Sequence, residues 1–138
     1  MSLDRRSPEA TSQVRVRYAD TDAMGVVYYA NYLTWFEVGR TDLMRQTGKT
    51  YREIEETERI YLPVVEAHCR YHRSARYDDL IEIRTRASLP SPARLRFDYE
   101  LSRVEDGALL AEGATVHVAM SHEGRARRIP KRLLEIVS

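Results

Sequence analysis

The stretch that decides the fold runs from residue 18 to residue 36 and reads YADTDAMGVVYYANYLTWF. Its first half is a loop that contains a glycine and two carboxylates, Asp20 and Asp22, and its second half begins an amphipathic helix. The first turn of a helix exposes backbone N–H groups that have no intrahelical acceptor, and the helix dipole favours negative charge there. Asp22 therefore lies within a few residues of donors that can hold a developing oxyanion. A carboxylate beside such donors is the minimum equipment for acyl transfer.

The helix is predicted from the spacing of its apolar residues. Tyr32, Phe36, Gly39 and Leu43 fall four, three and four residues apart, so they form one narrow face. Gly39 on this face suits a close approach of the helix backbone to the surface on which it packs. Gly48 marks the expected end of the helix.

The rest of the chain is predicted to be one short helix and a series of strands. Thr50 and Glu53 have the spacing of a capping box for a second helix that ends near Arg59. Asp106-Gly107 and Glu123-Gly124 are typical hairpin turns, and Pro130 opens a short C-terminal helix. The expected strands cover residues 13–18, 61–72, 80–89, 94–104, 108–120 and 126–129. One long helix followed by antiparallel strands predicts an α+β fold.

Length and composition indicate one globular domain. The chain has 138 residues, of which 43% are hydrophobic and 31% charged, as in ordinary folded proteins. A net charge of +1 provides no field to recruit nucleic acid or an anionic membrane. The single cysteine, Cys69, excludes an intramolecular disulfide, and no apolar run approaches the ~20 residues that span a bilayer. We expect a disordered segment at residues 1–12, a single domain over residues 13–138, and a cytoplasmic protein without membrane insertion.

The opening stretch resembles the signature of the hotdog-fold acyl-CoA thioesterases of the 4-hydroxybenzoyl-CoA thioesterase type, in their YbgC-like branch. The shared pattern is Asp-x-Asp-x-x-Gly-x-Val-Tyr-Tyr-x-Asn-Tyr, followed by Trp-Phe-Glu. The resemblance continues through residues 62–65 and 75–83 and covers roughly residues 13–135. It implies a curved antiparallel sheet wrapped around one long central helix, and hydrolysis of a short-chain or aromatic acyl-CoA.

The resemblance also implies roles for single residues. The family's catalytic carboxylate falls on Asp22, as nucleophile or general base, although a loop aspartate that only caps a turn is the alternative. The backbone N–H of Tyr29 would polarise the thioester. Gly25 either lets the loop pass close to substrate or is a simple turn glycine. Glu37 either supports the site or forms an ion pair with Arg40.

Three further side-chain roles are expected near these residues. Asn31 is expected to cap the helix, with orientation of the loop as the alternative. Asp78 and Asp79 are expected in a turn before a strand, where Arg76 is a candidate partner for one of them. The tyrosines of the loop serve either a subunit interface or an aryl-lined pocket: Tyr28, Tyr29 and Tyr32.

Other chemistries fit the sequence poorly. An EF-hand loop that began at Asp20 would place Met24 at the fifth position and Asn31 at the twelfth, where a glutamate is expected. His68 and His72 are four residues apart, but they lie in a predicted strand, where this spacing does not build a metal site. No Gly-x-Ser-x-Gly elbow is present, and Cys69 in mid-strand is typical of a packed thiol. We expect neither a metal nor a cofactor.

The carrier of the acyl group is indicated by arginines. Arg94, Arg96 and Arg128 suit the phosphates of coenzyme A, although for any single one of them a solvated surface charge is the favoured interpretation. Acyl-carrier protein is the alternative carrier, and a non-catalytic module that binds acyl-CoA or acyl-carrier protein is the alternative function. The resemblance implies a homodimer or homotetramer in which the neighbouring subunit completes each site.

Overall fold

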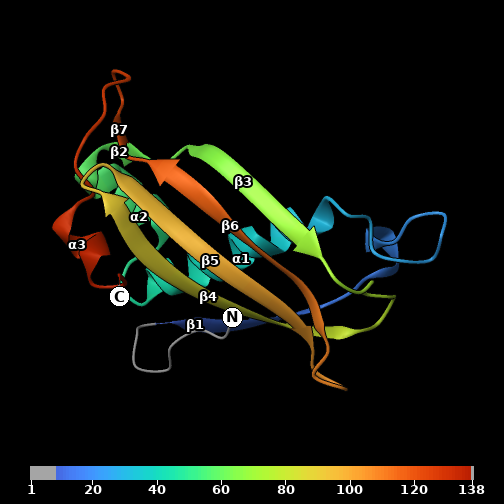
Figure 1. Cartoon of the computed structure of the whole chain (residues 1–138). Helices are drawn as coiled ribbons and strands as arrows, with labels where there is room; N and C mark the ends of the chain where they lie inside the picture. The colour runs from blue at the N-terminus through green and yellow to red at the C-terminus, as the bar shows by residue number, and fades with distance from the viewer. Residues whose placement is uncertain (1–8, 138) are drawn as a thin grey trace.

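A computed structural model describes residues 9–137. Strands with alternating buried and exposed side chains form an antiparallel sheet (Figure 1). The main sheet has five strands in the order β1-β4-β5-β6-β3. Their bounds are β1 Ala10–Arg15, β3 Val64–Tyr71, β4 Leu80–Ser91, β5 Arg94–Arg103 and β6 Leu109–Val118. A separate two-stranded sheet pairs β2 (Ile60–Tyr61) with β7 (Met120–Ser121).

The long helix α1 (Asn31–Arg45) packs on one face of the main sheet, against β1, β4 and β5. Figure 1 shows the strands curving across this helix. The ring of Phe36 stacks on that of Tyr99 at 4.2 Å between centroids. Gly39 faces Thr85 so closely that a side chain at position 39 would collide with it, which confirms the close approach predicted for this glycine. The predicted α+β class and central helix are therefore confirmed.

The shorter helices begin where their sequences predict. In α2 (Tyr51–Glu58), the Glu53 N–H donates to Thr50 Oγ1 at 3.2 Å and the Thr50 N–H donates to Glu53 Oε1 at 3.1 Å. This is the predicted capping box. Pro130 precedes α3 (Lys131–Leu134). No helix within residues 9–137 is both long and apolar enough to cross a membrane.

The first strand starts and ends about three residues earlier than the sequence predicts. Residues 10–12, expected in the disordered segment, belong to β1, where Ser12 lies opposite Ile83. Ser12 is buried, and its hydroxyl donates to Asp42 Oδ2 at 2.7 Å. Tyr18 lies beyond the strand in a 3₁₀ turn, Tyr18–Asp20. Residues 1–8 lie outside the described part of the chain, so the expected disorder there stays a prediction.

Two other strand predictions need correction. The expected strand at 61–72 is divided by Leu62 and Pro63 into β2 and β3, and proline has no N–H to donate to a ladder. The segment 126–129 is not a strand, because Ala126 forms only one isolated bridge, to Met120. The bonding of this segment does not continue along one partner strand, because the Ile129 N–H donates to Pro92 O.

The strand β3 forms one edge of the main sheet, and its side chains are exposed along almost its whole length. Val64 and Val65 are each 47% exposed. A long edge strand with apolar side chains is normally covered by another chain or element, because its unpaired backbone groups are a template for further pairing. This edge ends at Tyr71, beside the candidate site described next.

Candidate active site

The loop between Asp20 and Tyr28 is held in shape by its own backbone. The Asp22 N–H donates to Val26 O, and the Tyr28 N–H donates to Asp20 O, both at 2.9 Å. A further bond, from the Val27 N–H to Ala75 O at 2.9 Å, fixes the loop to the segment that follows β3. The position of Asp22 relative to the start of α1 is therefore set by backbone hydrogen bonds.

The carboxylate of Asp22 is half-buried and has one oxygen available. The Met24 N–H donates to Oδ1 at 2.8 Å, in the local turn that an aspartate favours. Within the described residues the other oxygen, Oδ2, has no hydrogen-bond partner. The contact with Met24 orients the group, and it leaves one oxygen free to attack a substrate or to accept a proton.

The backbone N–H of Tyr29 is also available. The carbonyl on the same peptide, Tyr28 O, accepts from the Asn31 N–H at 2.9 Å, whereas the Tyr29 N–H has no acceptor anywhere in residues 9–137. The next carbonyl, Tyr29 O, accepts from the Tyr32 N–H at 3.3 Å and from the Tyr71 hydroxyl at 3.1 Å. A free donor two residues before α1, at the positive end of its dipole, is what an oxyanion site requires.

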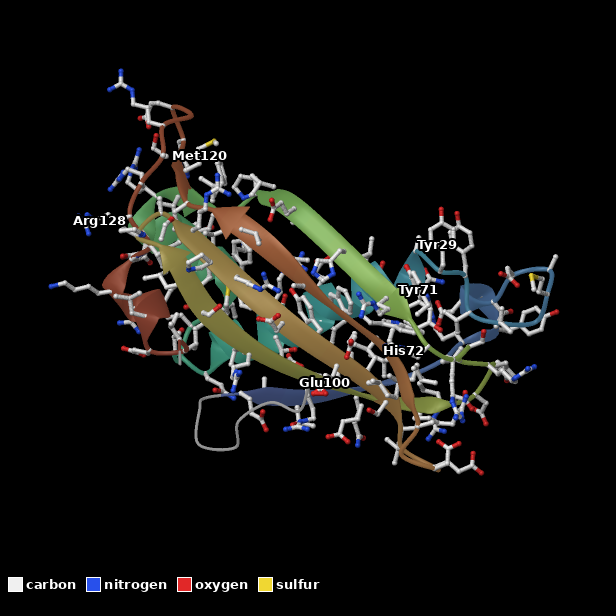
Figure 2. The ribbon with its side chains drawn as sticks, viewed as in Figure 1. Tyr29, Tyr71, His72, Glu100, Met120 and Arg128 are labelled. Atoms are coloured by element: carbon white, nitrogen blue, oxygen red, sulfur yellow. The ribbon has the colours of Figure 1, made fainter. Side chains whose placement is uncertain are left out.

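Asp22 and Tyr29 line one cleft of about 260 Å³. Tyr32 and Tyr71 form an aromatic wall of this cleft, with 5.1 Å between their ring centroids. Arg73 adds a positive charge to the lining. Figure 2 shows Tyr29, Tyr71 and His72 together at one end of the sheet.

The two tyrosines of this wall stay protonated over a wide pH range. Burial raises the pKa of Tyr32, whose hydroxyl accepts from the Ala75 N–H at 3.1 Å. Burial and the neighbouring Cys69 thiol raise the pKa of Tyr71 to about 12. Both groups therefore remain neutral hydrogen-bonding partners near neutral pH.

Asp20, the other carboxylate of the motif, has a structural role. It is buried, and its carboxylate accepts from the Arg17 backbone N–H at 2.8 Å and from the Arg17 guanidinium at 3.0 Å. Burial alone would raise the pKa of Asp20, but the bonds from Arg17 outweigh it and hold that pKa below its usual value. These contacts fix the turn that leads into the loop that contains Asp22.

The prediction that Asn31 caps the helix is wrong. The residue at the N-cap position is Ala30, and no side chain caps the helix there. A capping residue normally has an extended backbone, but Ala30 is already in a helical conformation (φ −69°, ψ −19°). Asn31 therefore lies inside the helix. The Asn31 amide instead donates to Asp20 O at 2.9 Å, which is the loop-orienting alternative.

Gly25 and Glu37 lie away from the cleft lining. Gly25 has φ +79°, and a Cβ built on it would meet nothing within 4 Å, so its turn conformation alone accounts for a glycine. Glu37 is exposed on α1 and lines a different depression, together with Thr34 and Asp42. The suggested ion pair between Glu37 and Arg40 is not formed, and Arg40 instead contacts the Tyr99 hydroxyl.

The three arginines expected to bind coenzyme A are not near Asp22 in the same chain. Arg94 lies opposite Val118 at the end of the sheet where β3 begins, whereas the cleft lies where β3 ends. Arg96 forms an ion pair with Asp98 at 3.1 Å. Figure 2 shows Arg128 at the end of the molecule opposite Tyr29. A strand the length of β3 spans roughly 25 Å, so no single chain brings these groups together.

The aspartates before β4 lie in the predicted turn, with a different partner. Asp79 Oδ2 accepts from the Arg76 N–H at 2.9 Å, but its ion pair is with Arg103, at 3.1 Å. Asp78 adopts a left-handed conformation with φ +70°. The Arg103 guanidinium also donates to Ser74 O, which holds a segment that lines the cleft.

A larger depression, of about 460 Å³, lies on the sheet face away from α1. Its lining mixes Arg86 and Arg96 with Asp98 and Glu112, and it contains no carboxylate beside an unpaired backbone donor. The chemistry therefore favours the smaller cleft as the candidate site. Across residues 9–137, no group of three or more His, Cys, Asp and Glu side chains is arranged to hold a metal ion.

No sequence pattern indicates that Tyr71 and Arg73 belong to the site. Tyr71 matched the alternation of a strand, and Arg73 was one exposed arginine among many. Both come within reach of Asp22 because β3 ends beside the loop, more than forty residues further along the chain. A single-sequence pattern does not report such a contact.

Comparison with known proteins agrees with this geometry. A family model described as the thioesterase-like superfamily matches residues 16–137. The acyl-CoA thioesterase YbgC of Haemophilus influenzae is 35% identical over 116 residues, which are 84% of this chain and 83% of that protein. A Bacillus subtilis relative is 41% identical over 73 residues, so this match spans about half of each protein, 53% of this chain and 52% of the relative.

Two solved structures have the same architecture. A 1,4-dihydroxy-2-naphthoyl-CoA thioesterase from Synechocystis superposes with a TM-score of 0.86 at 26% identity, over 93% of this chain and 95% of that one. The 4-hydroxybenzoyl-CoA thioesterase from Pseudomonas sp. strain CBS-3 superposes with a TM-score of 0.83 at 22% identity, over 94% and 99%. These similarities confirm the hotdog fold, and with the family match they confirm the resemblance seen in the sequence.

Proposed function

The chain belongs to the thioesterase-like superfamily, and we propose that it hydrolyses the thioester of a short-chain or aromatic acyl-CoA with Asp22 and the Tyr29 N–H. One observation carries the proposal. A single cleft contains a carboxylate with a free oxygen and an unpaired backbone donor at the start of α1. The names of the relatives, an acyl-CoA thioesterase and a naphthoyl-CoA thioesterase, support the class of reaction.

The proposed chemistry begins at the thioester carbonyl. Its oxygen accepts from the Tyr29 N–H, and this bond strengthens as negative charge develops on the oxygen. Asp22 Oδ2 either attacks the carbonyl carbon, giving a mixed anhydride that water then hydrolyses, or removes a proton from a water that attacks directly. Each route consumes one water and releases the free acid and coenzyme A. A thiol with a pKa near 8.5 leaves without a strong acid, so the mechanism needs no metal or cofactor.

The size and lining of the cleft support a short or aromatic acyl group. A cleft of about 260 Å³ is smaller than most drug-sized ligand pockets, which measure about 300–1,000 Å³. Its wall is aromatic, with Tyr29 and Tyr71 in an edge-on arrangement at 6.3 Å. Such rings favour a flat acyl group through edge-to-face contacts.

We propose further that the protein is at least a homodimer in which two copies of β3 pair antiparallel. The exposed apolar edge of β3 supports this arrangement, because an uncovered edge of this kind promotes association. A two-fold axis through the middle of β3 would reverse the partner's strand. The partner's β2–β7 end would then lie beside this chain's Tyr71.

This dimer would bring a basic segment to the candidate site. Arg128 lies close to the β2–β7 end of its own chain, opposite Tyr29 in Figure 2. In the dimer it would approach the cleft of the partner, with Arg125 and Arg127 from the same segment. Their charges suit the phosphates of coenzyme A or of the phosphopantetheine arm of acyl-carrier protein. The proposal thereby accounts for arginines that are far from Asp22 in one chain.

The dimer is tested by Val65→Lys, which places a charge on the exposed edge strand. We expect the wild type to elute as a dimer or tetramer in size-exclusion chromatography with light scattering. The variant is expected to shift toward monomer and to lose turnover. A monomeric wild type with full activity would contradict the shared site.

The reaction is tested by free-thiol release from a panel of short-chain, long-chain and aromatic acyl-CoAs. Wild type is compared with Asp22→Asn and with the matched control Asp78→Asn, since Asp78 is exposed and asparagine tolerates its positive φ. We expect turnover of short or aromatic substrates by wild type and control alone. Turnover only of acyl-carrier protein esters would change the carrier. Binding without turnover of any ester would identify a non-catalytic module.

A further inference from the structure

We propose that Tyr71 is a positioning residue, whose hydroxyl holds the Tyr29 backbone in the orientation that presents its N–H to the substrate. This inference rests on the proposed function, because it assigns a role in the same oxyanion site. Tyr71 comes from the last position of β3, and its hydroxyl donates to Tyr29 O at 3.1 Å.

Both peptide units of Tyr29 are held by hydrogen bonds, and one of these comes from outside its own loop. Its side chain is 62% exposed, so burial of its ring does little to fix it. On its N-terminal side, the peptide that carries the Tyr29 N–H is held by the bond from the Asn31 N–H to Tyr28 O at 2.9 Å. On its C-terminal side, Tyr29 O receives a long bond of 3.3 Å from the Tyr32 N–H and the bond from Tyr71. Within residues 9–137, the Tyr71 hydroxyl is the one side-chain group that hydrogen-bonds to either peptide unit of Tyr29, so it adds to the backbone restraints on the rotation of this residue.

The ring of Tyr71 is itself held by contacts with two other aromatic rings. It stands edge-on to the Tyr29 ring at 6.3 Å and to the buried Tyr32 ring at 5.1 Å. The Tyr32 hydroxyl accepts a hydrogen bond from the Ala75 N–H, so the ring on which Tyr71 packs is held in place. Because the hydroxyl of Tyr71 stays protonated well above neutral pH, it remains a donor to Tyr29 O under working conditions.

Orientation of an oxyanion donor matters more in the transition state than in the ground state, because charge on the carbonyl oxygen is then greatest. Loss of the Tyr71 hydroxyl should therefore lower kcat and leave substrate affinity almost unchanged. A side chain that only stabilised the fold would instead change the amount of folded protein. These two roles can be separated by kinetics.

The test is Tyr71→Phe, which keeps the ring and removes the hydroxyl. We expect kcat to fall roughly tenfold, the upper range for one hydrogen bond, while the Kd of a non-hydrolysable acyl-CoA thioether stays within about twofold. Tyr77→Phe is the matched control, because Tyr77 is exposed, lies outside the cleft lining and has its ring edge-on to that of Tyr18. Rates are taken per folded protein, well below the Tm of each variant.

Three outcomes would overturn the inference: an unchanged kcat, a change confined to Kd, or an equal loss in the Tyr77→Phe control. Failure of the proposed function itself looks different, because the wild type would then release no thiol or Asp22→Asn would remain active. A drop in kcat for Tyr71→Phe alone, beside an active wild type, supports the role of Tyr71.

Discussion

The close contact between α1 and β4 makes a quantitative prediction for Gly39→Ala. A methyl group at position 39 would collide with Thr85 Oγ1 and lie 2.9 Å from Ile83 Cγ2. Both neighbours are fully buried on the inner face of β4, so neither can turn away into solvent. Alanine gains about 1 kcal/mol over glycine in helix propensity, but overpacking of a core costs about 1–3 kcal/mol.

We therefore expect Gly39→Ala to lower the free energy of unfolding by up to about 2 kcal/mol, which corresponds to a fall in Tm of up to roughly 10 °C. Thr85→Ala should rescue it, because it removes the colliding oxygen, which is also buried without a hydrogen-bond partner. Urea unfolding of both single variants and of the double variant, at one protein concentration, measures the coupling. Thr34→Ala on the exposed face of α1 is the control and should be neutral or stabilising. A stabilised Gly39→Ala, or no rescue by Thr85→Ala, would refute the reasoning.

Two further predictions concern stability. Thr50→Ala should cost about 1 kcal/mol in urea unfolding, because it breaks the capping box at the start of α2; an unchanged midpoint would show that the box contributes nothing. Burial lowers the pKa of His117, whose ring is bonded to Leu62 O and Thr115 Oγ1, both at 2.9 Å. As pH decreases, the imidazole of His117 is therefore protonated in the unfolded chain before it is protonated in the folded protein. The contribution of His117 to the free energy of unfolding is complete above about pH 6.5. It falls as pH decreases toward the lower pKa of the folded state, by up to about 1.4 kcal/mol per pH unit. His117→Gln should flatten this part of the stability–pH curve, and an unchanged slope between pH 7.5 and 5.5 would contradict the assignment.

The helices could be predicted because their sequences carry local signals. The apolar spacing of α1 and the Thr50–Glu53 pair report structure within one or two turns of the chain. The start of β1 could not be predicted, because Ala10 and Ser12 are small or polar residues that are buried only by what packs on them. The segment 126–129 is expected to be a strand, but strand pairing depends on a partner that its sequence does not specify.

The position of Asp22 near the start of α1 could be predicted for the same reason, whereas the role of Tyr29 is implied by the family resemblance. Asp22 and Tyr29 lie seven residues apart in one loop, so their proximity is nearly a local property. Asn31 shows the limit of local rules, since its amide binds a carbonyl eleven residues away and does not cap its own helix. Tyr71 and Arg73 reach the cleft only through the fold, and the arginines expected to bind coenzyme A would reach it only through a second chain.

The most direct test of the central claim is the kcat of Asp22→Asn, measured beside its affinity for an acyl-CoA thioether that cannot be hydrolysed. Asparagine keeps the size of the side chain and its bond from the Met24 N–H, but it is neither a base nor an effective nucleophile. We expect thiol release to fall by at least about 10³-fold and the Kd of the thioether to stay within about threefold. Turnover by Asp22→Asn close to that of the wild type would contradict the claim.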